Sequence, residues 1–169
     1  EKNGALVPFV RNKKLSSDTA GTDSVISDCI KKINSQGTSF HFCIYPTSPL
    51  LTINDLKKAY KKIIKTNFER LVAVGEFNFS PLRAFQIVNK NKIKYKFKNF
   101  ANKRSQDLPE LCHDSGTFYI YNTKKFLSRK YSNSSKNWTF YKFENIKTID
   151  INTYEDLRYA SFVYDYLKR

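Results

Sequence analysis

An acidic and an amide side chain stand two residues apart near the end of the chain, in the stretch TIDINTYEDL (residues 148–157). On an extended backbone, positions two apart project to the same face, so Asp150 and Asn152 would present their oxygens together. Carboxylate and amide oxygens are suitable ligands for a hard cation such as Mg²⁺. Asp and Asn also shape turns that carry no chemistry, so the pair indicates either a metal site or a turn.

The elements that must position this pair alternate between strands and helices. Apolar runs typical of strands occur at residues 5–10, 39–45, 70–77, 116–121 and 138–143, and residues 85–88 and 93–100 flank a hairpin turn at 89–92. Periodic apolar patterns predict helices over residues 21–33, after Thr52, over 123–130 and after Thr153. The alternation predicts one α/β layered domain, residues 1–169, with a mainly parallel sheet.

Three helix starts carry side chains that could cap them. Thr22 or Asp23 is expected to cap the first helix. The later pairs have the spacing of capping boxes: Thr52 with Asp55, and Thr153 with Asp156.

Polar side chains follow several of the predicted strands. In layered α/β domains, ligands bind beyond the carboxyl ends of the strands. The groups there are Arg11 with Ser16 and Asp18, Thr47 with Ser48, Arg83, and Asp150 with Asn152. The sequence therefore predicts a ligand site at this rim of the sheet, but the placement does not identify the ligand.

The chain is strongly basic, with a net charge of +15. Its lysines lie on helix faces and along residues 90–103, which favours a solvated surface that attracts small anionic molecules over a dedicated nucleic-acid surface. No apolar run is long enough to span a bilayer. Three scattered cysteines, Cys29, Cys43 and Cys112, indicate reduced thiols in a cytoplasmic protein and argue against a structural zinc site.

Four segments, in this order, resemble the cytidylyltransferases that activate nonulosonic acids such as sialic and pseudaminic acid. They are residues 9–25 (FVRNKKLSSDTAGTDSV), 43–60 (CIYPTSPLLTINDLKKAY), 104–122 (RSQDLPELCHDSGTFYIYN) and 148–157. The third segment is the most specific and resembles the pseudaminic branch. Asn12 stands where the family usually has a proline, and Asn152 replaces the second of its metal-binding aspartates.

The resemblance implies a Rossmann-like domain of the nucleotide-diphospho-sugar transferase type. It covers essentially the whole chain, which resembles the C-terminal two-thirds of the family domain without the first strand and the glycine-rich phosphate loop. Activity of this chain by itself is therefore left open. The resemblance also implies a homodimer, with a dimerisation and sugar-binding insertion at about residues 94–112.

The implied reaction transfers CMP from CTP to an acidic nine-carbon sugar and releases pyrophosphate. Asp150 and Asn152 would hold Mg²⁺, and Arg104 would hold the sugar carboxylate, so Asp150 and Arg104 are the implied catalytic residues. The implied substrate-binding residues are Arg11, Ser16, Thr47, Ser48, Arg83, Gln106, Asp107 and Asp114. These roles lead us to expect that Arg11, Thr47, Arg104 and Asp150 converge on one pocket at one rim of the sheet.

Two alternatives stay open. A basic nucleic-acid-binding module would gather aromatic and basic side chains on one exposed face and bind in a salt-sensitive manner. A non-catalytic relative of the transferases would also tolerate the loss of a carboxylate at Asn152.

Overall fold

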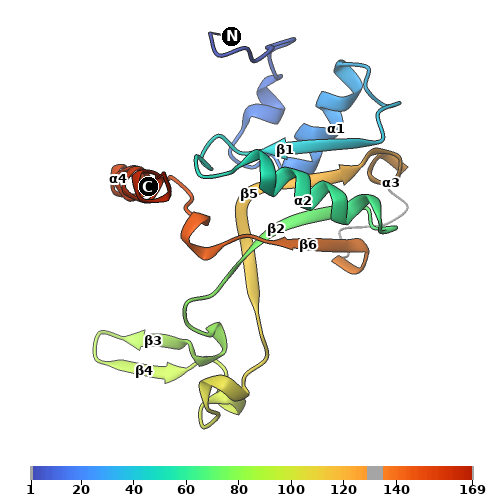
Figure 1. Ribbon diagram of the computed structural model, residues 1–169. Helices are drawn as coiled ribbons and strands as arrows, with labels where there is room; N and C mark the ends of the chain where they lie inside the picture. Colours follow the sequence, from blue (N-terminus) through green and yellow to red (C-terminus); the bar gives the residue numbers. More distant parts are fainter. Residues whose placement is uncertain (1, 129–134, 169) are drawn as a thin grey trace.

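The computed structural model describes residues 2–128 and 135–168. In this part of the chain, a four-stranded sheet has helices on both faces, and a two-stranded arm projects from one end (Figure 1). The structure is thus mixed α/β, as predicted, and is compatible with a Rossmann-like fold.

The sheet contains β1 (Phe40–Ile44), β2 (Arg70–Glu76), β5 (Cys112–Asn122) and β6 (Trp138–Lys142), in the order β1-β5-β2-β6. β2 and β6 are parallel, whereas β5 is antiparallel to β1 and to β2. β1, β2 and β6 therefore share one direction, as a mainly parallel sheet requires. The inserted β5 makes two of the three pairings in the described sheet antiparallel, which the sequence did not predict because side-chain alternation carries no strand direction.

Helices cover both faces of this sheet. α2 (Ile53–Ile64) packs on one face, and α1 (Thr22–Lys32) and α3 (Thr123–Ser128) lie on the other. The first face is closed by the buried side chains Ala59, Ile63, Leu71, Ala73, Phe118 and Ile120. The second is closed by Ile30, Tyr121 and Phe126. The helix predicted at 123–130 is confirmed up to Ser128, since Arg129 and Lys130 lie outside the described residues.

The last helix, α4 (Tyr154–Leu167), packs beside the sheet (Figure 1). Ala160 and Val163 are its buried residues, and they contact Leu50 and Ile149. The segment that leads into α4 is thereby held close to the loop that follows β1.

Both predicted capping boxes are confirmed, at Thr52 with Asp55 and at Thr153 with Asp156. The predicted cap of α1 is wrong. The residue before the helix is Gly21, which has no side chain that could form a cap. Thr22 and Asp23 are the first two residues of the helix, and both have other partners. The Thr22 hydroxyl is 2.8 Å from the Tyr45 hydroxyl, and the Asp23 carboxylate accepts a hydrogen bond of 2.5 Å from Arg70.

The arm contains the predicted hairpin, β3 (Phe85–Asn89) paired with β4 (Lys92–Tyr95). Three short 3-10 turns connect it to the sheet, at Pro81–Arg83, Lys98–Phe100 and Ser105–Asp107. β5 then runs from the arm into the sheet (Figure 1).

The strand predicted at residues 5–10 is wrong. This segment has no regular structure, and Leu6, Val7 and Val10 are largely exposed. A 3-10 turn follows at Lys13–Ser16. No helix in residues 2–128 and 135–168 is both long and apolar enough to cross a membrane.

Candidate functional site

A polar cluster forms at one rim of the sheet, around Gly116 of β5. Its backbone φ of +63° is a conformation that glycine adopts without steric cost. Between Val72 and Val74 of β2 the register with β5 shifts, so β5 carries extra residues here. This irregularity turns the Gly116 peptide toward the loop after β1, where the hydroxyl of buried Ser48 donates to the Gly116 carbonyl over 3.3 Å. Thr47, the preceding residue, is half-buried.

Asp114 fixes this peptide from within the same strand. One carboxylate oxygen accepts a hydrogen bond of 2.9 Å from the Gly116 N–H, and the other accepts one of 2.6 Å from the Tyr119 hydroxyl. Burial, together with this carboxylate, raises the pKa of Tyr119 far above its usual value, so the phenol remains a donor. Asp114 therefore positions the backbone at the rim.

Asp150 and Asn152 lie together, as expected from their spacing. The Asn152 side-chain amide donates to the Asp150 carboxylate over 3.1 Å. Asp150 also lies against Gly116, because a side-chain carbon at position 116 would be 3.9 Å from its carboxyl group. The pair precedes α4, and the Asn152 N–H donates to Asp156 over 3.0 Å. The aspartate of the α4 capping box therefore also orients the candidate metal-binding pair, Asp150 and Asn152.

A buried ion pair supports the turn that leads to Asp150. The Lys147 ammonium lies 3.6 Å from the Asp55 carboxylate, and both side chains are largely buried. The Tyr141 hydroxyl donates to the same carboxylate over 3.0 Å. Burial alone would raise the pKa of Asp55, but hydrogen bonds from Thr52 and Tyr141 and the charge of Lys147 outweigh it and lower the pKa.

Sequence reasoning missed Lys147 and Tyr141. Lys147 looks like one more surface lysine of a basic chain, and Tyr141 belongs to a predicted half-buried strand. Their contacts with Asp55, at the start of α2, show that Lys147 and Tyr141 help to hold the turn before Asp150 in place.

The rim fits a weakly held Mg²⁺ better than a dedicated metal cage. Within the described residues, no group of three or more His, Cys, Asp and Glu side chains could hold a metal ion. Mg²⁺ commonly keeps several waters and uses one or two carboxylates with substrate phosphates. Asp150, which is exposed, can supply one carboxylate, and the Asn152 amide carbonyl could add an oxygen if the amide turned over.

The second group of predicted site residues lies on the arm, away from this rim (Figure 1). The Arg104 guanidinium makes a two-pronged contact with Asp107, with hydrogen bonds of 2.8 and 3.1 Å. These hydrogen bonds raise the pKa of Arg104. Arg83 donates to Ser105 over 3.3 Å, and Gln106 is exposed in the same turn. Arg104 therefore does not share a pocket with Asp150 in one copy of the chain.

The third group lies in the N-terminal segment, at the top of Figure 1. Arg11 and Ser16 are exposed, and the Ser16 hydroxyl donates to the Asn12 carbonyl over 3.0 Å within the 3-10 turn. The rim thus gathers Thr47, Ser48, Asp114, Asp150 and Asn152, while Arg11 and Ser16 lie in this separate segment and the remaining predicted residues lie on the arm.

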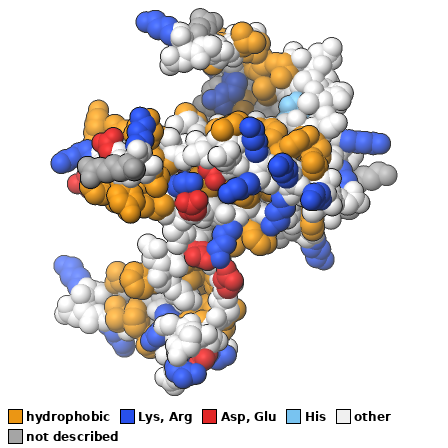
Figure 2. Space-filling model, viewed as in Figure 1, with side chains coloured by type: hydrophobic (Ala, Val, Ile, Leu, Met, Phe, Trp, Pro, Cys, Tyr) orange, Lys and Arg blue, Asp and Glu red, His pale blue; other side chains and the backbone are white. Residues whose placement is uncertain are grey.

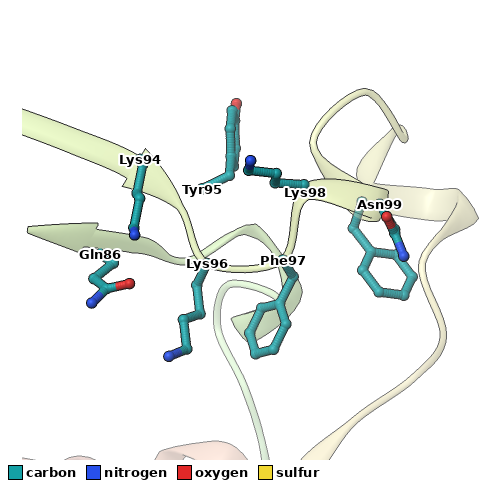
Figure 3. A pocket seen from close by; sticks show the side chains of 8 residues that line it. Gln86, Lys94, Tyr95, Lys96, Phe97, Lys98 and Asn99 are labelled. Atoms are coloured by element: carbon teal, nitrogen blue, oxygen red, sulfur yellow. The ribbon is translucent and has the colours of Figure 1, made fainter.

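An open pocket of about 460 Å³ lies on the arm, between β4 and the turn that follows it. Lys94, Lys96 and Gln86 line one side, together with Phe97 (Figure 3). Its positive lining suits an anion. The pocket is separate from the Asp150 rim, so its size gives no argument for the rim site.

Comparisons with known proteins give three informative relatives. Two proteins named pseudaminic acid cytidylyltransferase, from Campylobacter jejuni subsp. jejuni serotype O:23/36 (strain 81-176) and serotype O:2 (strain ATCC 700819 / NCTC 11168), are each 34% identical over 165 residues. Each match covers 96% of this chain and 71% of the relative. A Helicobacter pylori (strain ATCC 700392 / 26695) protein is 31% identical over 124 residues, which is 73% of this chain and 24% of that protein. It is named pseudaminic acid cytidylyltransferase and UDP-2,4-diacetamido-2,4,6-trideoxy-beta-L-altropyranose hydrolase. No protein-family model matches the chain.

Proposed function

Because this chain belongs to the cytidylyltransferase family that activates nonulosonic acids, we propose that it transfers CMP from CTP to pseudaminic acid and releases pyrophosphate. The rim supports this proposal, since Ser48 and the Asp150–Asn152 pair come from segments far apart in the sequence and meet around Gly116. Three of the four segments that carry the family resemblance contribute to this cluster. Pseudaminic acid is favoured over sialic acid because the relatives carry its name.

We propose Mg²⁺ as the cofactor, held by Asp150 with help from Asn152 and the CTP phosphates. The ion would neutralise the triphosphate and polarise the phosphorus that is attacked. Around it, Ser48 and Asp114 keep the Gly116 peptide in place, and the Asp55–Lys147 pair holds the turn before Asp150. The chain's own contribution is therefore mainly the positioning of charged groups.

The sugar acid is proposed to bind through Arg104, with Gln106 and Arg83 nearby, and Arg11 and Ser16 are proposed to contact the nucleotide. The Asp107 carboxylate accepts hydrogen bonds from Nε and Nη2 of Arg104. A sugar carboxylate would therefore have to displace Asp107 or bind the remaining N–H groups of the guanidinium. Because the arm stands away from the rim, these residues can complete the site most simply from a second copy, and we propose a homodimer.

The apolar face of the arm supports this assembly. Phe85 pairs across the hairpin with Tyr95 and Ile87 with Ile93, so all four side chains share one face. Ile87 and Ile93 are 77% and 57% exposed. A two-stranded sheet is marginally stable by itself in water, and burial of this face against another copy would stabilise it.

The proposal is tested by pyrophosphate release from CTP and Mg²⁺ with pseudaminic or sialic acid. We expect release with pseudaminic acid, and at least about a hundredfold loss in Asp150→Ala. Asp165→Ala, which removes an exposed acid from α4, is the matched control and should keep activity. Calorimetry of CTP binding provides a second readout that needs no turnover.

The two readouts separate the proposal from its alternative. CTP binding that depends on Asp150, without pyrophosphate release, would indicate a non-catalytic relative in which Asn152 has weakened the metal site. Absence of both CTP binding and pyrophosphate release would contradict the proposed function.

A further inference from the structure

The pocket on the arm carries lysines that no acidic side chain balances. Gln86 and Lys94 pair across the hairpin, so their side chains share one face, and Lys96 follows two residues later. Figure 3 shows all three side chains pointing to the same side of the ribbon. Residues 77–106 contain no Asp or Glu, and neither lysine forms an ion pair in the part of the chain that the structure describes. The pocket therefore presents uncompensated positive charge.

This charge disfavours the hairpin as long as no anion balances it. Neighbouring like charges on one face of a strand pair repel each other, and a two-stranded hairpin is only marginally stable by itself. An anion between Lys94 and Lys96 would relieve the repulsion and would accept charge-assisted hydrogen bonds from both ammonium groups. Lys98 also lines the pocket, so an anion with several negative charges matches the lining better than one with a single charge.

The pocket also offers aromatic and amide side chains. Its volume of about 460 Å³ falls within the range of roughly 300–1,000 Å³ that is typical of small-molecule sites. Phe97 is 40% exposed and lines the pocket together with Phe100, whose ring centroid lies 5.3 Å from the Lys103 ammonium. An aromatic face can stack on any nucleobase, and the amides of Gln86 and Asn99 can donate and accept hydrogen bonds at a base edge. Inorganic phosphate would leave these groups unused.

We propose that the arm pocket is a second nucleotide site, in which Lys94 and Lys96 bind the phosphates of a nucleoside triphosphate and Phe97 stacks on its base. The site is distinct from the Asp150 rim, because the arm stands away from the sheet and no rim residue lines the pocket (Figure 1). Because stacking accepts every base, the site takes ATP as well as CTP. The bound nucleotide stabilises the hairpin, since it balances the charge of the basic face.

Calorimetric titration with ATP in the presence of EDTA, at about 0.15 M salt, tests the site. The rim is proposed to need Mg²⁺, so EDTA suppresses binding there. We expect one saturable site per chain, both in the wild type and in Asp150→Ala, and at least about tenfold weaker binding in the double variant Lys94→Gln/Lys96→Gln. The double variant Lys57→Gln/Lys61→Gln removes the same charge from the exposed face of α2 and should keep wild-type affinity.

Two further variants test the contact with the base. Phe97→Leu removes the ring but keeps an apolar side chain, so ATP should bind at least about fivefold more weakly while inorganic tripolyphosphate binds as before. Phe79→Leu is the control, because Phe79 is exposed and does not line the pocket. Amide hydrogen exchange provides an independent readout: ATP should slow exchange in β3 and β4 and leave α2 unchanged. Thermal unfolding verifies that each variant is folded.

Several outcomes overturn the proposal. Absence of saturable ATP binding, or equal losses in the two lysine double variants, would show only a general attraction of anions to a basic surface. Tripolyphosphate that binds as tightly as ATP would exclude a role for the base. A single-stranded oligonucleotide that binds at least tenfold more tightly than ATP would assign the arm to nucleic acid, and loss of ATP binding in Asp150→Ala would assign it to the rim. None of these readouts uses catalysis, so failure here is distinguishable from failure of the proposed transferase activity.

Discussion

Gly116 is the residue on which the rim cluster depends. Its N–H is held by Asp114, its carbonyl accepts from Ser48, and its missing side chain leaves room beside Asp150. Asp114, Ser48 and Asp150 come from different segments of the chain, and all three lie against Gly116. The backbone conformation of Gly116 therefore sets how these three side chains lie relative to each other. The positive φ at this position is therefore a feature of the site as well as of the fold.

Gly116→Ala should destabilise the protein by about 1–2 kcal/mol, because a residue with a side chain is strained at this φ. Gly37→Ala is the control, since φ there is not positive and no atom lies within 4 Å of an added methyl group. Urea unfolding should show a lower midpoint only for the change at position 116. Equal midpoints for the two variants would show that the chain adopts another conformation at Gly116.

Asn152→Asp should strengthen metal binding at the rim, because it adds a second negative charge beside Asp150. We expect about a tenfold lower dissociation constant for Mn²⁺, used as a probe for Mg²⁺, which corresponds to about 1.4 kcal/mol. Asn91→Asp adds the same charge at the hairpin turn and should leave Mn²⁺ affinity unchanged. Paramagnetic relaxation of water protons measures both, and equal affinities in the two variants would contradict a metal site at Asp150.

At the scale of the elements, two capping boxes hold the two helices that border the rim. Both place an aspartate at the third helical position, but Asp55 is buried and Asp156 is not. Asp55 also contacts distant segments, at Tyr141 and Lys147, whereas Asp156 accepts hydrogen bonds from Asn152 and Thr153, directly before its helix. The N-terminus of α2 is thereby connected to β6 and to the turn before Asp150.

Asp55→Asn should cost about 1–3 kcal/mol of unfolding free energy at pH 7, because a buried carboxylate loses its charge while its donors remain. Asp156→Asn should cost less, since Asp156 is only half-buried and Asp55 is buried. The folded pKa of Asp55 lies below its unfolded value, so its stabilisation is present above about pH 4 and is lost as the pH falls through the folded pKa. Urea unfolding at several pH values should therefore show the difference between wild type and Asp55→Asn narrowing from pH 7 to pH 3, and a constant difference would contradict this role.

The sequence predicted elements better than it predicted their relations. The pattern around Thr52 and Asp55 identified a capping box, and the spacing of Asp150 and Asn152 predicted their contact, because both depend on neighbours along the chain. The antiparallel direction of β5 and the burial of Lys147 depend on distant segments and left no local signal. The segment at residues 5–10 has an apolar sequence but pairs with no strand within residues 2–128 and 135–168, so its composition alone predicted a strand wrongly.

At the scale of the whole molecule, positive charge is spread unevenly. Residues 77–106, which include the arm, contain eight Lys and Arg and no Asp or Glu. Lysines also spread over α2 on the sheet body (Figure 2). The arm therefore combines one strongly basic face, which carries Lys94 and Gln86, with the apolar face of Phe85, Ile87, Ile93 and Tyr95. Hydrophobic side chains are visible on the arm in Figure 2.

The two faces of the hairpin allow a matched test of the homodimer. Ile87→Lys places a charge on the apolar face, and Gln86→Lys adds the same charge to the opposite, basic face. If two copies meet through the apolar face, Ile87→Lys should weaken the dimer at least about a hundredfold, since a buried unpaired charge is costly, while Gln86→Lys should leave it unchanged. Sedimentation equilibrium at several protein concentrations measures both constants. A wild-type chain that stays monomeric, or a dimer that tolerates Ile87→Lys, would show that the arm does not hold two copies together. The proposed dimer would then not explain how Arg104 and Asp150 act in one site.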